Sequence, residues 1–253
     1  MAEIKDRQFA SIDWTDPHNP RSMIYNDIYF SSSGGEGETV HTFVNGNCLE
    51  ERFRQLPFGS TFIIAETGFG TGSNLLILLN RYLDLLKKKS LSLTYISFEK
   101  YPLCPEDMLR AHSGYTSDIE ILPEFLQKYQ NSDFSLNEIR FTLSETVSVR
   151  IMLGDISCNL EDFSRKYRKQ INAWFLDGYS PSRNPDLWTG ELFEAMQITA
   201  APDCTLATYT VSGAVRRGLA AAGFAVEKTP GYERKKEMTR GRIKQTSDMS
   251  ATE

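Results

Sequence analysis

The stretch that most constrains the fold joins a short strand to a helix through a glycine-rich turn. Residues 62–65 are apolar and have the pattern of a buried strand, and Gly68, Gly70 and Gly72 follow. Leucines then recur at helical spacing from Ser73 onward. In such a unit a ligand can approach the backbone at the helix N-terminus. The stretch therefore predicts an α/β protein with a ligand site at this turn.

The glycine spacing excludes two common phosphate-binding motifs. The third glycine comes one residue too early for the GxGxxG dinucleotide fingerprint, and no GK[ST] sequence follows for a P-loop. The pattern is instead an acid, Glu66, followed by three glycines at alternate positions. A glycine turn alone is weak evidence, so the rest of the chain has to define the site.

Further segments with the pattern of strands alternate with helical ones. The strands are expected at 93–99, 148–155, 173–177, 205–210, 224–229 and 236–243, with residues 102–130 mostly helical. This order predicts a mostly parallel, seven-stranded sheet with helices on both faces. Before the glycine turn, 27–31 and 39–53 also have the pattern of strands, and Asn45-Gly46 predicts a tight hairpin turn within the second.

Four of these strands end in an acid, namely Glu66, Glu99, Asp155 and Asp177. Each acid alone is more often a cap or a turn residue, and the Asp-Gly and Ser-Pro pairs after the fourth strand are ordinary turn formers. Ligands of open α/β sheets, however, bind at the carboxyl ends of the strands. Four acids in register at that edge favour a binding site over four unrelated turns.

Composition narrows the class of protein. The chain has 253 residues and a net charge of −5, and no apolar run is long enough to span a bilayer. Its N-terminus lacks the apolar core of a signal peptide, so we expect a cytoplasmic protein without a membrane partner. Four dispersed cysteines and three dispersed histidines predict reduced thiols, no metal site and no Ser-His-Asp triad.

Positive charge gathers near the C-terminus. Residues 204–244 hold nine Lys or Arg against three Glu, which leaves the remainder of the chain strongly acidic. Such a segment can contact phosphates, although charged edge strands also exist only to prevent aggregation. Lys236, Arg240, Arg242 and Lys244 share parity in the last expected strand and should line one face of it.

The order of Glu66, the three glycines, Glu99, Asp155 and Asp177 resembles the class I S-adenosylmethionine-dependent methyltransferases. The stretches "DIYFS", "AETGFGTGSNLL", "ISFEKYPL", "AWFLDGYSPSRNPDLWT", "LATYTVSGAVRRGLAAAGF" and "GYERKKEM" are similar to the methyltransferase half of a bifunctional bacterial family. That family completes 5-methylaminomethyl-2-thiouridine at the tRNA wobble position. The resemblance covers roughly residues 25–245 and implies a Rossmann-like methyltransferase domain with an antiparallel last strand and an N-terminal β-hairpin.

The resemblance implies S-adenosylmethionine as cofactor and the 5-aminomethyl group of (2-thio)uridine in tRNA as the methyl acceptor. Asp177 would take up the proton of the amine, and Tyr179 would wall the acceptor base. The residues implied in cofactor binding are Glu66, Gly68, Phe69, Gly70, Gly72, Asn74, Glu99, Lys100, Asp155 and Ile156. The residues implied in tRNA binding are Arg183, Arg216, Arg217, Arg234, Lys235, Lys236, Arg240 and Arg242.

The resemblance also implies a domain plan: an N-terminal extension at 1–54, the methyltransferase domain at 55–245 and a polar tail at 246–253. A FAD-dependent oxidoreductase half should follow in that family, so this chain is expected to be a stand-alone methyltransferase or a fragment, with an oxidoreductase partner in cis or in trans. Two alternatives stay open. One is a methyltransferase or aminopropyltransferase-like enzyme acting on a small amine, and the other is a non-catalytic tRNA-binding module.

Overall fold

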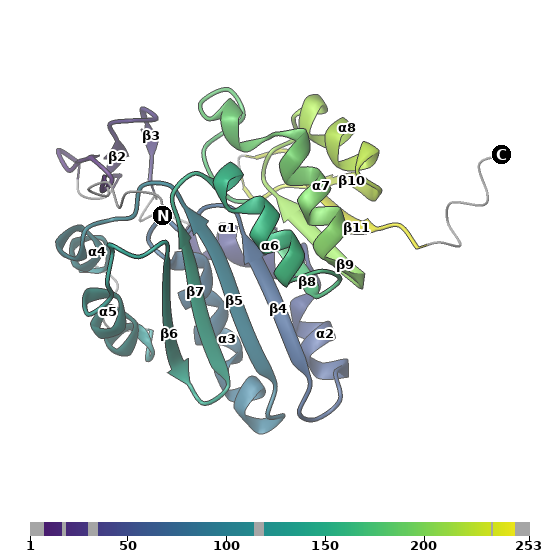
Figure 1. Cartoon of the computed structure of the whole chain (residues 1–253), viewed down its shortest axis with the longest axis horizontal. Coiled ribbons are helices and arrows are strands. Elements are labelled where there is room, and N and C mark those ends of the chain that lie inside the picture. Colours follow the sequence, from purple (N-terminus) through teal and green to yellow (C-terminus); the bar gives the residue numbers. More distant parts are fainter. Residues whose placement is uncertain (1–7, 17–18, 30–34, 114–118, 234, 246–253) are drawn as a thin grey trace.

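The computed structural model describes residues 8–16, 19–29, 35–113, 119–233 and 235–245. Most of them build one large sheet flanked by helices (Figure 1). Its strands are β4 (Thr61–Glu66), β5 (Ser92–Glu99), β6 (Glu138–Ser144), β7 (Val147–Leu153), β8 (Ile171–Phe175), β9 (Ala200–Thr208), β10 (Phe224–Pro230) and β11 (Glu237–Ile243). They lie in the order β10-β11-β9-β8-β4-β5-β7-β6.

The centre of the sheet is parallel and its two ends are antiparallel. Strand β4 pairs in parallel with β5 and β8, and these continue in parallel to β7 and β9. The last strand, β11, is antiparallel to both of its neighbours, as the resemblance implied. Strand β11 lies between β9 and β10 and is not an edge strand. The alternative that its charges only protect a sheet edge from aggregation is therefore wrong.

The sheet has eight strands rather than the expected seven, because β6 was missed. Ile139 and Leu143 of β6 are buried, whereas Arg140 and Thr142 are exposed. This alternation is typical of an edge strand with one solvated face. The polar residues hid the strand, since they interrupt the continuous apolar run that is typical of a buried strand.

Helices cover both faces. One core joins the sheet to the π-helical segment η1 (Val40–Asn45), α2 (Leu49–Gln55), α3 (Ser73–Lys88), α4 (Pro105–His112) and α5 (Leu122–Gln130), and α1 (Gly35–Thr39) contacts η1 and α3. A second core joins it to α6 (Leu160–Lys166), α7 (Gly190–Thr199) and α8 (Gly213–Ala221). Short 3-10 turns, η2 (Ile156–Cys158) and η3 (Pro185–Leu187), follow β7 and β8. The predicted α/β class with helices on both faces is confirmed.

The predicted strands at 39–53 are wrong, because this segment is helical from α1 through α2. Gly46 has a φ of −58°, so Asn45-Gly46 is not a hairpin turn. A Cβ on Gly46 would lie 2.1 Å from the Thr42 carbonyl oxygen and 2.9 Å from the Ala207 Cβ. Glycine thus lets the helical segment pack directly onto β9, a tertiary contact that local alternation of residues could not reveal.

The N-terminal residues instead form a small antiparallel sheet. Its strands are β1 (Ile12–Asp13), β2 (Arg21–Ser22) and β3 (Asp27–Ile28), and β2 and β3 lie beyond one end of the large sheet (Figure 1). The strand expected at 27–31 is therefore reduced to two residues, and 30–31 lie outside the described residues. The polar tail at 246–253 also lies outside them. No helix in the described ranges is long and apolar enough to cross a membrane.

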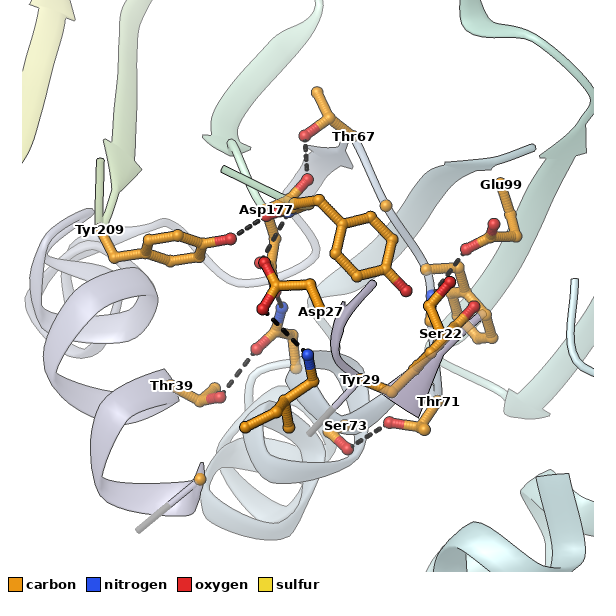
Figure 2. A pocket seen from close by; sticks show the side chains of 18 of the residues that line it. Ser22, Asp27, Tyr29, Thr39, Thr67, Thr71, Ser73, Glu99, Asp177 and Tyr209 are labelled. Atoms are coloured by element: carbon orange, nitrogen blue, oxygen red, sulfur yellow. Dashed lines mark hydrogen bonds between the residues drawn. The ribbon is translucent and has the colours of Figure 1, made fainter. Parts of the chain in front are cut away.

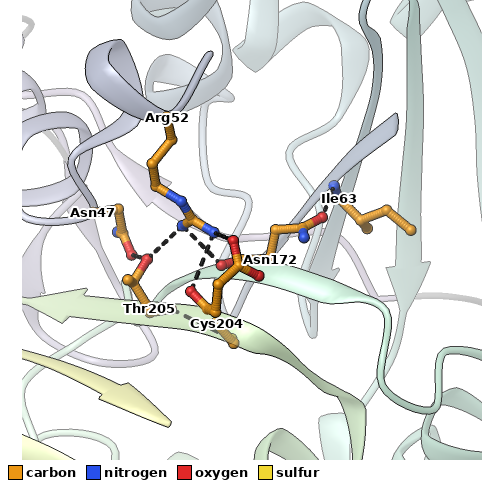
Figure 3. Close-up of polar contacts among 7 residues, drawn as sticks. Asn47, Arg52, Ile63, Asn172, Cys204 and Thr205 are labelled. Atoms are coloured by element: carbon orange, nitrogen blue, oxygen red, sulfur yellow. Dashed lines mark hydrogen bonds and ion pairs between the residues drawn. The ribbon is translucent and has the colours of Figure 1, made fainter. Parts of the chain in front are cut away.

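Arg52 ties α2 to the middle of the large sheet (Figure 3). Its guanidinium donates to the Asn172 carbonyl oxygen at 3.0 Å, to Thr205 Oγ1 at 2.8 Å and to Asp203 Oδ2 at 2.8 Å. The Asn172 side chain in turn accepts from the Ile63 N–H at 2.8 Å. One side chain thus satisfies polar groups of β8 and β9 where the pairing of these two strands is irregular.

Candidate active site

A cavity of about 820 Å³ lies at the carboxyl ends of the parallel strands. The segments that follow β4, β5, β7, β8 and β9 line it, and residues 22–29 of the small sheet line it from the other side. In Figure 2, Glu99 and Tyr209 mark opposite sides of this space, with Asp177 between them. This is the place where open α/β sheets bind their ligands.

The glycine turn is shaped by close contacts with the segment after β8. A Cβ on Gly68 would lie 3.2 Å from the Asp177 carbonyl oxygen, so glycine allows the two turns to touch. Gly70 and Gly72 have φ of +53° and +72°, the left-handed region that favours glycine. Gly72 then begins α3 as its N-cap. Gly68 and Gly70 of the predicted turn therefore present backbone without a side chain to the cavity.

Glu99 closes β5 and points into the cavity near this turn. Its Oε2 accepts from the Gly70 N–H at 2.8 Å, and its Oε1 accepts from the Tyr101 N–H at 2.9 Å. Burial raises the pKa of Glu99 to about 7, and these two backbone donors oppose the rise. Each oxygen keeps capacity to accept a further hydrogen bond, as a pair of ribose hydroxyls would require.

Asp177 follows β8 and has both carboxylate oxygens fixed. Its Oδ1 accepts from the Gly178 N–H at 2.8 Å, and its Oδ2 accepts from Asn74 Nδ2 at 2.6 Å. Burial raises the pKa of Asp177 to about 6, against the effect of both donors. A carboxyl group that titrates just below neutrality can accept a proton at physiological pH.

Glu66 lies behind Asp177 rather than in the cavity. It is only 1% exposed and does not line the space. Ser97 Oγ donates to its Oε2 at 2.7 Å and Asn74 Nδ2 to its Oε1 at 2.8 Å. Burial, followed by the negative charge of Asp177, raises the pKa of Glu66 to about 8. The implied contact of Glu66 with the cofactor stays a prediction, and its hydrogen bonds are those of a group that supports the cavity residue Asn74 from behind.

Tyr179 belongs to an aromatic cluster that closes the cavity on the side of the small sheet. Its ring stacks on Tyr25 with centroids 4.3 Å apart and meets Tyr29 edge-on at 6.0 Å. Trp188 Nε1 donates to the Tyr179 carbonyl oxygen at 3.2 Å and fixes the loop. Tyr209 donates its hydroxyl to the Gly178 carbonyl oxygen, next to Asp177 (Figure 2). Flat side chains thus gather around the acidic group.

Asp155 and Lys100 form an ion pair of 2.7 Å at the cavity wall, and Ile156 follows in η2. Burial opposes the ionisation of Asp155, but hydrogen bonds from Lys100 and Ser157 together hold its pKa below the usual value. Phe69 also lines the cavity, although most of its ring packs against Phe125 and Tyr129. The expected residues from β5 and β7 are thus brought together.

Several cavity residues were missed by the sequence analysis. They come from the N-terminal segment, from α1, from α4 and from the position after β9, and they are Ser22, Tyr25, Tyr29, Thr39, His112 and Tyr209. For Tyr209 a signal existed, because it directly follows a parallel strand, as Asp177 nearly does. The others come from segments whose place over the site depends on tertiary packing. Gly72 was expected to touch the cofactor, but it does not line the cavity.

The expected nucleic-acid-binding residues are spread over the loop after β8, α8 and β11. Arg183, Arg217 and Lys236 are exposed, as is Arg242, and Arg216 donates to the Val211 carbonyl oxygen at 3.4 Å. Lys235 lines the cavity and pairs with Glu38, while Arg240 pairs with Glu227 at 2.8 Å. Arg234 lies outside the described residues.

Comparisons with known proteins agree with this fold. The family described as "S-adenosyl-L-methionine-dependent methyltransferase" matches residues 119–244. The chain is 37% identical over 238 residues, 94% of its length, to the "tRNA 5-methylaminomethyl-2-thiouridine biosynthesis bifunctional protein MnmC" of Pseudomonas fluorescens, and covers 35% of that protein. With the MnmC of Hahella chejuensis, identity is 39% over 233 residues, 92% of this chain and 36% of that one.

A solved structure shows the same fold. The crystal structure of MNMC2 from Aquifex aeolicus has a TM-score of 0.70 with 23% identity, and the match covers 95% of this chain and 72% of that chain. The eight-stranded sheet with a cavity at its strand ends is a Rossmann-like α/β methyltransferase fold, and residues 119–244 match the S-adenosyl-L-methionine-dependent methyltransferase family. The chain resembles MnmC, and it spans about a third of the length of the MnmC proteins that it matches.

Proposed function

We propose that the chain N-methylates the 5-aminomethyl group of (2-thio)uridine at the tRNA wobble position in the cytoplasm, giving 5-methylaminomethyl-2-thiouridine. The observation that carries the proposal is the Asp177 carboxylate, which faces the cavity beside Tyr179 and the glycine turn. The similarity to MnmC supplies the substrate class. An oxidoreductase that acts before this step, in cis or in trans and with FAD, belongs to the same proposal.

The acceptor is an amine, which is mostly protonated in water and must expose a free lone pair to be methylated. Ionised Asp177 can hold the neutral amine through a hydrogen bond and stabilise the positive charge that grows as the methyl group arrives, and it can then take up the proton that the methylated nitrogen releases. S-adenosylmethionine, when bound, supplies that methyl group. Tyr179 and the rings beside it exclude water and offer a flat surface to the uracil ring.

The cavity has features that fit the cofactor. The turn at Gly68 and Gly70 exposes backbone without side chains, which leaves room for the methionine part. Glu99 has acceptor capacity for the ribose hydroxyls, and Asp155 with Ile156 can meet the adenine edge. Asn74 was expected among these residues, but both of its N–H donors are used by Asp177 and Glu66.

We expect Glu99→Gln to weaken the binding of S-adenosylmethionine by about 1–3 kcal/mol, because a charged acceptor of two hydroxyl donors is lost. The pH dependence gives a second readout. The hydroxyls bind the ionised carboxylate, so the affinity of the parent protein should rise as pH increases through the Glu99 pKa of about 7. Calorimetry between pH 6 and pH 8 should show this rise in the parent protein and a flat profile in the variant.

The tRNA part of the proposal predicts that Arg183→Ala with Lys236→Ala weakens tRNA binding. Both residues are exposed and adjoin segments that line the cavity. Each phosphate contact that is lost should reduce the logarithmic salt slope by roughly 0.7–0.9. Arg165→Ala in α6 is the control, since that arginine pairs with Asp162 and does not line the cavity. An unchanged salt slope in the double variant would mean that Arg183 and Lys236 do not contact tRNA phosphates.

The direct test of the function uses labelled S-adenosylmethionine and tRNA from cells that lack the final methylation. Nucleoside analysis should show the label in 5-methylaminomethyl-2-thiouridine. Label transferred only to a small polyamine would favour the alternative of a small-amine enzyme. The likeness to aminopropyltransferases rested on a predicted hairpin before the glycine turn. That segment, 39–53, is helical in the structure. Salt-dependent tRNA binding without cofactor binding would instead favour a non-catalytic module.

A further inference from the structure

Asn74 lies at the centre of a group of hydrogen bonds that joins four elements beneath the cavity. Its Nδ2 donates to Asp177 Oδ2 at 2.6 Å and to Glu66 Oε1 at 2.8 Å, while its Oδ1 accepts from Thr39 Oγ1 at 2.8 Å. Asn74 and Thr39 are only 7% and 6% exposed. These hydrogen bonds run from α1 through α3 to the carboxyl ends of β4 and β8, and Figure 2 shows Thr39 on the Asp177 side of the cavity.

The two ends of this amide have distinct tasks. The carboxyl groups of Asp177 and Glu66 require donors, so they orient Nδ2 toward themselves. The buried Oδ1 on the other end accepts a hydrogen bond from the Thr39 hydroxyl. A carbonyl oxygen that accepts a hydrogen bond also polarises the amide and strengthens donation by its nitrogen. Removal of the Thr39 hydroxyl should therefore loosen the hold of Asn74 on Asp177.

We propose that Thr39 and Asn74 are positioning residues for methyl transfer: Thr39 orients the Asn74 amide, and Asn74 holds the Asp177 carboxylate in the orientation that the acceptor nitrogen requires. This inference rests on the proposed function for the role of Asp177. It assigns Asn74 to support of the acceptor site rather than to contact with the cofactor. It also gives α1 a role in the reaction, although the sequence predicted a strand from Thr39 onward.

Other charged and titratable groups act on Asp177 as well. Glu66 faces it from β4, and Glu38 from α1 opposes its ionisation, whereas Lys235 before β11 favours it. The charges of Asp177, Glu38 and Asp27 in turn reach the Tyr209 hydroxyl. The Thr39 variants leave all of these groups in place. A shift in the titration of Asp177 in those variants can therefore be assigned to the loss of the Asn74 contact.

The test compares Thr39→Val, which keeps the branched shape but lacks the hydroxyl, with Thr39→Ser, which keeps the hydroxyl. The Asp177 carboxyl is titrated by carbon NMR and assigned through Asp177→Asn. Single-turnover methyl transfer to tRNA is measured across the same pH range. In Thr39→Val the midpoint should rise by about one pH unit because a donor to the ionised form is weakened. The rate at neutral pH should fall about tenfold to a hundredfold through misplacement.

Thr39→Ser should restore most of the rate and the parent midpoint. Thr42→Val, the same substitution in η1 at a buried residue that does not line the cavity, controls for a general loss of stability. Asn74→Ala should raise the midpoint at least as much as Thr39→Val, and it replaces that variant if Thr39→Val does not fold. The same midpoint and rate in Thr39→Val and Thr39→Ser would overturn the proposal.

The titration needs no substrate, so the two proposals can fail separately. A parent protein that does not methylate tRNA would sink the proposed function, whatever the midpoints show. Methyl transfer in the parent protein, with a midpoint that does not respond to Thr39→Val or Asn74→Ala, would leave the function standing and sink the positioning role.

Discussion

Asp177→Asn should bind S-adenosylmethionine nearly as well as the parent protein but lose methyl transfer by a factor on the order of 10²–10⁴. Asparagine keeps the shape and the turn-forming ability of aspartate. It can neither take up the proton of the amine nor balance the charge that grows on nitrogen. The parent rate should fall as pH drops below about 6, where Asp177 becomes protonated, and the deficit of the variant should shrink at high pH, where the amine is neutral.

The structure adds one complication to this variant. An amide at position 177 places an NH₂ group against either Asn74 Nδ2 or the Gly178 N–H, so one donor loses its acceptor. The cost should be about 1–3 kcal/mol of unfolding free energy, and rates must be taken well below the melting temperature. Asp162→Asn on the exposed face of α6 is the control. An Asp177→Asn rate within about threefold of the parent, less than the 1.4 kcal/mol of a tenfold change, would return Asp177 to the role of a turn residue.

Arg52→Ala should lower the free energy of unfolding by about 2–3 kcal/mol, the scale of hydrogen bonds from a charged donor to groups left unsatisfied. The side chain is 14% exposed and satisfies the Asn172 carbonyl oxygen and Thr205 (Figure 3). Its guanidinium also lies over the Phe62 ring at 4.8 Å. The pair with Asp203 contributes little, since Asp203 is 63% exposed. Urea unfolding measures this loss of free energy. The slope of the free energy of unfolding against urea concentration should stay unchanged.

Arg54→Ala, two residues later on the same helix, is the matched control. Arg54 is 63% exposed and pairs only across one helical turn with exposed Glu50. Its removal should change the free energy of unfolding by no more than about 0.5 kcal/mol. Equal losses in the two variants would mean that the contacts of Arg52 with β8 and β9 do not stabilise the fold.

Much of the site could be predicted because its signals are local. A short apolar run before Glu66, glycines at alternate positions and a leucine repeat from Ser73 are properties of neighbouring residues, and they produced β4, the turn and α3. The acids at the strand ends needed only one further rule, since parallel strands present their carboxyl ends at one edge. Glu99 and Asp177 therefore lie where the sequence placed them, at the cavity.

Other features depended on partners that are distant in the chain. Residues 39–53 alternate like a strand but are helical, because Phe43, Val44 and Phe53 are buried against the sheet and Gly46 touches Ala207. Strand β6 has few apolar residues because it is the strand at one edge of the large sheet. Tyr25 and Tyr29 reach the cavity only through the way the small N-terminal sheet packs over it.

The sequence by itself determined the class of fold, the glycine turn and the four acids at the strand ends, because periodicity and strand-end position are encoded within short stretches of chain. Only the tertiary structure decided which acid faces the cavity and which supports it. Glu66 and Asp177 are both acids at the ends of strands, and the Asn74 side chain donates a hydrogen bond to each of them. Their roles differ because the groups around Glu66 bury it. Hydrogen bonds between residues up to 103 positions apart set that difference, and no local pattern records them.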